Sequence, residues 1–191
     1  MTGNDLLTEF DAISLNDFNG VLVGTTAMKL AHLNTSLRRV YEMVCKVAVQ
    51  TYTHAGGDDV VDLTGLVPRL ITVTALRLDD SDVTRVSNFV ESGWHGMNEG
   101  YLYLQDLPAD DYVIEGYVIP SPIVASATTI SDVDERLYSP IVKLAVVDAL
   151  GAHEETAEQA NRRATLEQTA LTQVLRVSGT QSRSRFNSIF Q

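Results

Sequence analysis

The most informative segment of the chain is residues 139–151, which read Ser-Pro-Ile-Val-Lys-Leu-Ala-Val-Val-Asp-Ala-Leu-Gly. The proline suits the first turn of a helix, and Gly151 suits the end of one. Between them, residues 141–150 are apolar around most of the circumference of a helix, which predicts a helix buried on nearly all sides. These ten residues include Lys143 and Asp148, so the segment is too short and too charged to cross a membrane.

The segment that follows predicts a second, long helix over residues 154–177. Glu154 and Glu155 fall in its first turn and Arg176 in its last, a distribution that matches the helix dipole. One side of this helix carries a seam of mostly small apolar residues, along which another helix could approach closely. The seam consists of Ala157, Ala160, Ala164, Leu171, Val174 and Val177. A subunit interface and packing on the preceding helix explain the seam equally well.

Helical periodicity stops after residue 178, and residues 179–191 are expected to form an extended basic tail. The tail combines Arg183 and Arg185 with the apolar anchors Phe186, Ile189 and Phe190. This composition is typical of a segment that becomes ordered on a partner, although chain ends of any composition often fray.

On the other side of the buried helix, the pattern predicts two N-terminal helices followed by short strands. Apolar spacing favours helices at residues 4–13 and 26–44. Strands are expected at 45–52 and 60–63 as one hairpin, at 70–78, and at 101–104 and 112–119 as a second hairpin. Residues 79–82 read as a turn, 83–86 as a return strand, and 87–100 as a loop with one helical turn. Residues 120–131 read as an extended connector.

Strands and helices therefore form separate runs, which predicts an α+β fold with a small antiparallel sheet region. We expect one α+β domain over residues 1–178, with a strand-rich part at about 45–120 and a helical part made of 1–44 and 139–178. The chain of 191 residues is long enough to bury a sizeable core.

The charge is strongly acidic and unevenly distributed. The formal net charge is −11, with 14 Lys and Arg against 25 Asp and Glu. Residues 58–115 hold twelve acids against three arginines, a net charge of −9, whereas the last sixteen residues hold three arginines and no acid. Such a balance disfavours conventional binding to DNA or to an anionic membrane surface.

Motifs for catalysis, cofactors or metals are weak or missing. The histidines, His32, His54, His95 and His153, are scattered and form no HExxH pattern, and no nucleotide-binding glycine motif occurs. Residues 79–82 lack the glycine and glutamate of a calcium loop. Cys45 is expected to be a small buried apolar residue and not a nucleophile. We therefore expect no catalytic, cofactor-binding or metal-binding residues.

Residues 137–154 resemble the head-to-tail adaptor proteins of tailed bacteriophages, including the tail tubular protein A group of short-tailed phages. In these proteins an acidic connector, here with Asp132, Asp134 and Glu135, leads into a buried helix, a Gly-Ala corner and a long helix rich in Glu, Ala and Arg. Residues 112–120 are also similar to the strand that precedes the helix pair. The resemblance covers residues 101 to about 177, and the remainder only in the order of elements.

The resemblance implies a structural virion protein without enzymatic activity, located in the neck and made in the host cytoplasm. It implies a ring, of twelve subunits in this family, that joins the portal protein to a downstream tail, nozzle or stopper protein. DNA would pass through the ring without specific binding. The basic tail would dock on the portal, and the long-helix seam would lie between subunits. The candidate channel-lining acids are Asp58, Asp59, Asp79, Asp80 and Asp82.

Two alternatives remain open at the level of sequence. The chain could be a neck stopper or a tail-completion or terminator protein, which also forms a ring. It could instead be a small hydrolase or binding module with a site near Trp94 and His95.

Overall fold

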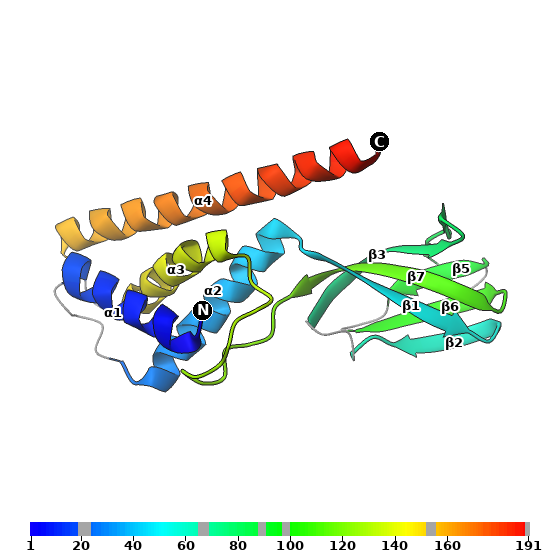
Figure 1. Cartoon of the computed structure of the whole chain (residues 1–191), viewed down its shortest axis with the longest axis horizontal. Helices are drawn as coiled ribbons and strands as arrows, with labels where there is room; N and C mark the ends of the chain where they lie inside the picture. Colours follow the sequence, from blue (N-terminus) through cyan, green and yellow to red (C-terminus); the bar gives the residue numbers. More distant parts are fainter. Residues whose placement is uncertain (19–23, 65–68, 88–90, 97–99, 152–155, 190–191) are drawn as a thin grey trace. The chain divides into compact units, whose positions relative to one another are not determined.

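A computed structural model describes residues 1–18, 24–64, 69–87, 91–96, 100–151 and 156–189, without the side chains of residues 17, 69 and 180–189. The chain divides into two compact units. Unit 1 comprises residues 1–44 and 122–191, and unit 2 comprises residues 45–121. Unit 1 contains the residues of the expected helical part together with residues 122–138 and 179–191, and unit 2 contains the residues of the expected strand-rich part. The observed elements, helices together with antiparallel sheets, confirm the α+β fold class (Figure 1).

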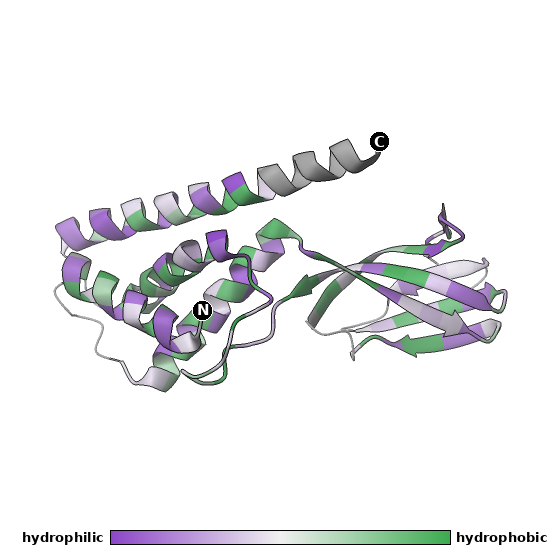
Figure 2. Ribbon diagram, viewed as in Figure 1, coloured by the Kyte–Doolittle hydropathy of each residue, from purple (hydrophilic) through white to green (hydrophobic). Residues whose placement is uncertain are grey.

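Unit 1 is a helical bundle built around one apolar helix. It contains α1 (Gly3–Phe18), α2 (Thr26–Val44), a 3-10 turn η1 (Glu135–Leu137), α3 (Tyr138–Leu150) and α4 (Ala157–Ile189). Helices α1, α2 and α4 all contact α3. Ten of the thirteen residues of α3 are buried, and its ribbon is mostly hydrophobic in Figure 2. The buried helix expected from residues 141–150 is therefore the centre of the bundle.

Polar side chains fix how α2, α3 and α4 pack on one another. Asp148 of α3 accepts a hydrogen bond from the Ser36 hydroxyl (3.1 Å), and Arg39 lies 3.8 Å from the same carboxylate. Arg39 also donates to Glu167 of α4 at 2.9 Å. Because Ser36 is fully buried, this network selects one arrangement of the three helices.

The connector between the units is attached to unit 1 at several points. The Asn34 side-chain amide both donates to the carbonyl of Ile123 (3.0 Å) and accepts from its N–H (2.8 Å). The Tyr41 hydroxyl accepts from the N–H of Asp134 at 3.0 Å, and burial raises the pKa of Tyr41 to about 12. The extended connector expected at residues 120–131 is thus attached at Ile123, and backbone hydrogen bonds join Ser126, Thr128 and Ile130 to residues 1–4.

Unit 2 is made of two antiparallel sheets. One sheet has the order β1-β7-β3-β4, with β1 (Val47–His54), β7 (Asp110–Ile119), β3 (Arg69–Leu78) and β4 (Ser81–Asp82). The other has the order β2-β6-β5, with β2 (Gly57–Asp62), β6 (Tyr101–Leu107) and β5 (Gly93–Gly96). Alternate residues of both sheets form one apolar core that includes Trp94, Leu76, Leu104 and Tyr112.

The two expected hairpins are wrong in their pairing, although their strands exist. Strand β1 pairs with β7, and β2 pairs with β6, so each chain reversal at 55–56 and 108–109 passes from one sheet to the other. A turn between alternating strands has the same residue types in both arrangements, and only the long-range partner decides between them. Residues 93–96 form strand β5 where a loop with one helical turn was expected, and the return strand after the 79–80 turn is β4 and not 83–86.

The last helix is longer than expected. The structure continues α4 through residue 189, so the backbone of most of the expected tail is helical and not extended. Residues 178–189 contain no proline, and their serines and arginines do not interrupt a helix that is already formed. The expected start of this helix at Glu154 and Glu155 lies outside the described residues.

Candidate functional site

Three turns that are far apart in the sequence meet at one end of unit 2. His54 at the end of β1 lies opposite Asp110 at the start of β7, and Gly57 at the start of β2 lies opposite Leu107 at the end of β6. Arg77 near the end of β3 lies opposite Val113, which is also near the start of β7. The turns β1–β2, β3–β4 and β6–β7 are therefore neighbours, at the right-hand end of the strands in Figure 1.

These turns gather carboxylates into what we call the acidic end. Most of its carboxylates are exposed. Asp79 (φ 48°) and Asp80 (φ 63°) occupy the two left-handed positions of the β3–β4 turn, a conformation that aspartate tolerates. The side chain of Asp82 pairs with Arg77 at 2.9 Å. The members of the acidic end are Asp58, Asp59, Asp79, Asp80, Asp82, Asp106, Asp110 and Asp111.

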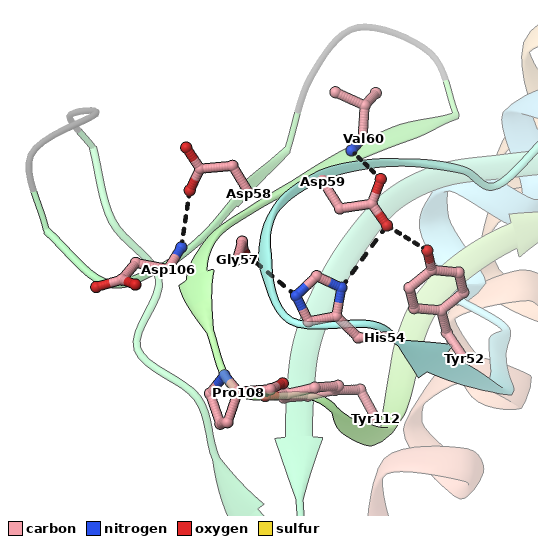
Figure 3. Close-up of polar contacts among 9 residues, drawn as sticks. All are labelled: Tyr52, His54, Gly57, Asp58, Asp59, Val60, Asp106, Pro108 and Tyr112. Carbon is pink, nitrogen blue, oxygen red and sulfur yellow. Dashed lines mark hydrogen bonds and ion pairs between the residues drawn. The ribbon is translucent and has the colours of Figure 1, made fainter.

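All five candidate channel acids belong to the acidic end, but Asp59 differs from the others. Its Oδ2 accepts a hydrogen bond from the Tyr52 hydroxyl at 2.5 Å, and its Oδ1 accepts from the N–H of Val60 at 2.8 Å (Figure 3). The bond from Tyr52 lowers the pKa of Asp59 and raises the pKa of Tyr52. Asp59 thus has a role inside the fold, whereas Asp58, Asp79, Asp80 and Asp82 are exposed, with Asp82 paired to Arg77.

His54 completes a buried polar cluster beneath this end, and no catalytic or metal-binding motif in the sequence marks this residue. Its side chain is fully buried, its Nε2 lies 3.2 Å from the carbonyl oxygen of Gly57, and its Nδ1 lies 3.6 Å from Oδ2 of Asp59 (Figure 3). Through these two contacts the ring lies between the start of β2 and the carboxylate of Asp59. The cluster lies under the β1–β2 turn. The pair Gly56-Gly57, both with positive φ, is the sequence feature that indicates this turn.

The seam expected on the long helix is divided between the inside and the outside of the bundle. Val174 is buried and Leu171 and Ala160 are half-buried, whereas Ala157 and Ala164 are exposed. The buried side of α4 is completed by Ala170 and by Val177, the seam's last residue. Part of the candidate interface is therefore used within the chain, against the bundle around α3.

A shallow groove runs beside the exposed part of α4. It has a volume of about 400 Å³ and is lined by Lys143 of α3 and by residues of α4 that include Leu166 and Thr169. The hydroxyls of Thr165 and Thr169 donate to carbonyls of their own helix, four residues earlier, and so expose their methyl groups. This side of α4 can contact another protein surface without leaving hydroxyls unpaired.

The candidate portal-docking residues fall mostly where side chains are not described. Arg183, Arg185, Phe186 and Ile189 lie in the last turns of α4, and Phe190 lies outside the described residues.

Trp94 and His95 do not line a common cleft. Trp94 points into the core, where its indole N–H donates to the carbonyl of Val83 at 3.0 Å. His95 points to the opposite face of the sheet and lies against Tyr103, with ring centroids 4.8 Å apart. Neighbouring residues of a strand face opposite sides of the sheet, so the side chains of Trp94 and His95 lie on different faces.

Within the described ranges, no three side chains of the His, Cys, Asp or Glu type are grouped closely enough to hold a metal ion. Among the helices of the described parts, none combines the length and the apolar character needed to cross a bilayer.

A comparison of the sequence with models of known protein families finds no match. A comparison with curated proteins likewise finds no match.

Proposed function

We propose that this chain is a structural head-to-tail adaptor of a tailed bacteriophage. In this role it forms a ring, of twelve copies by the resemblance, between the portal protein and a downstream tail, nozzle or stopper protein. DNA passes through the ring during packaging and ejection. The protein is accordingly placed in the neck of the virion and has no enzymatic role.

The observation that carries the proposal is the acidic end. Asp58, Asp79, Asp80 and Asp106 come from three separate turns, yet the fold gathers them on one exposed surface. A wall of carboxylates repels the phosphate backbone, whereas a basic wall would bind DNA by releasing counterions. The acidic end therefore suits a surface along which DNA moves without being held.

The length of α4 gives independent support for attachment to a neighbour. At 1.5 Å per residue, the 33 residues of α4 span about 50 Å, whereas the 13 residues of α3 span about 20 Å. Helix α4 must therefore project beyond the helix that covers its buried side. A projecting helix end whose sequence includes Arg183, Arg185 and Phe186 suits docking on a protein partner.

The proposal is tested by native mass spectrometry of the purified chain mixed with the cognate portal protein. We expect a portal complex that carries twelve copies of this chain. Binding to a downstream tail protein but not to the portal would indicate a stopper or terminator instead. A chain that stays monomeric and ignores both partners would overturn the proposal.

A second experiment tests the acidic end as a DNA-facing surface. Asp79→Asn, Asp80→Asn and Asp106→Asn remove three charges, and asparagine tolerates the left-handed backbone at all three positions. Particles with this triple variant should assemble but eject DNA more slowly at low salt, with the defect fading at high salt. The matched control is Glu9→Gln, Glu135→Gln and Glu158→Gln in unit 1, and equal slowing by the control would contradict the assignment.

A further inference from the structure

The outer face of the three-stranded sheet carries an unusual set of side chains, which we call the tyrosine face. Val61, Leu102 and Leu104 point into the core, so the alternate residues of the same strands point outward. Val60 of β2 and His95 of β5 both lie opposite Tyr103 of β6, and form a row across the sheet. The tyrosine face consists of Asp58, Val60, Asp62, His95, Tyr101 and Tyr103.

Large apolar surface remains exposed on this face. Val60 is 50% exposed and Tyr101 is 41% exposed, although both lie on ordered strands. His95 and Tyr103 are half-buried against each other, with an angle of 43° between their rings. An exposed tyrosine and an exposed valine on one sheet face, next to two partly exposed rings, are typical of a protein contact surface.

Two carboxylates flank the rings and are held in place by the fold. Oδ1 of Asp58 accepts from the N–H of Asp106 at 2.9 Å. Oδ1 of Asp62 accepts from the N–H (2.8 Å) and the hydroxyl (2.6 Å) of Thr64. The bonds orient each carboxylate through one oxygen, so little ordering entropy remains to be lost when a partner binds.

The strands of this sheet offer these carboxylates no cation of their own. The sequences of β2, β5 and β6 contain four aspartates and neither lysine nor arginine. A second copy of the chain that brought its own tyrosine face against this one would place like charges together, which disfavours symmetrical self-association.

We propose that the tyrosine face binds an arginine-bearing segment of a protein partner. A guanidinium group can stack on a tyrosine ring and at the same time form two parallel hydrogen bonds with a carboxylate. The ammonium group of lysine has neither the planar surface nor the fork of donors, so arginine fits this face better than lysine. The proposal does not depend on the adaptor function.

The test is titration of the isotope-labelled full chain with a tetra-arginine peptide, followed by NMR of amide and aromatic groups. We expect the largest shifts at Val60, His95, Tyr101 and Tyr103, and binding about tenfold tighter than that of a tetra-lysine peptide. Tyr101→Ala should abolish the preference for arginine. Its side chain is partly exposed, and an unchanged amide spectrum elsewhere would show that the variant is folded.

A matched pair of double variants separates specific binding from general attraction to an acidic protein. Asp58→Asn with Asp62→Asn should weaken arginine binding about tenfold, whereas Asp110→Asn with Asp111→Asn removes the same charge elsewhere and should weaken it less than about twofold. Equal loss in both pairs, equal affinity for the lysine peptide, or shifts spread over the whole acidic end would overturn the proposal. Self-association that depends on Tyr101 would also overturn it, because a second copy would then be the occupant.

Discussion

At the scale of single residues, Tyr41 links the stability of the helical unit to alkaline pH. Its ring is 1% exposed, and burial raises the pKa of its hydroxyl from 10 to about 12. The folded state therefore favours the neutral phenol. Below pH 10 this preference contributes about 3 kcal/mol to the free energy of unfolding. The contribution is lost as the pH rises from 10 toward 12.

Tyr41→Phe should remove this pH dependence. At pH 8 the variant should be less stable by about 1 kcal/mol, because the N–H of Asp134 loses its acceptor. Between pH 10 and 12 its free energy of unfolding, measured with urea, should fall less steeply than that of the natural chain. Other tyrosines also titrate in this range, so the difference between the two proteins is the relevant quantity. Parallel curves would contradict the assignment.

Gly116 is a residue whose lack of a side chain is required by packing. A Cβ at this position would lie 2.8 Å from the carbonyl oxygen of Thr72 and would also clash with Leu70. Gly116→Ala should therefore lower the free energy of unfolding by about 1–3 kcal/mol. The control is Gly96→Ala, since nothing lies within 4 Å of a Cβ there. Equal effects in urea unfolding would show that the close approach is not the cause.

At the scale of elements, the sequence predicted the helices better than the strand pairing. Residues 26–44 form α2 as expected, because an amphipathic helix is specified by spacing within its own residues. The partners of β1 and β2 lie far away in the sequence, and alternation alone cannot distinguish a hairpin from a passage between sheets. The sequence did not predict strand β5 because it begins and ends with glycine, and Trp94 is its one apolar side chain.

The candidate site was predictable to a similar extent. The density of acidic residues along the chain predicts the candidate acids, and aspartates in turns are expected to be exposed. These acids come together because of the pairing of β1 and β3 with β7, and no local motif predicts that pairing. Asp59 is the exception among these acids. Side chains alternate between the two faces of a strand, and Asp59 lies on the inward side of β2, near Tyr52.

The buried and projecting parts of α4 should have different effects on stability and on portal binding. Among the described side chains, the last buried one in α4 is that of Val177. Removal of residues 179–191 should leave the melting temperature nearly unchanged and weaken portal binding about tenfold or more. Val174→Ala, at a fully buried position, should instead cost about 2 kcal/mol of stability and leave binding intact. A large fall in melting temperature after truncation would assign the segment to the core.

At the scale of the whole molecule, unit 2 is an insertion between α2 and α3 whose two ends meet. Val47 lies opposite Tyr117, and the N–H of Val118 donates to the carbonyl of Lys46 at 2.9 Å. The unit also has its own apolar core. Residues 45–121, expressed alone, should therefore give a dispersed amide NMR spectrum and a cooperative unfolding transition. A poorly dispersed spectrum would show that unit 2 needs unit 1 in order to fold.

The nested order of the chain has a consequence during synthesis. Helices α1 and α2 leave the ribosome before the sandwich, but α3, which covers their apolar sides, is made only after residue 137. Unit 2 can complete its core before α3 is available to cover Leu33 and Val40 of α2. We therefore expect a stage of synthesis in which unit 2 is folded while the apolar sides of α1 and α2 are still exposed, because α3 has not yet been made.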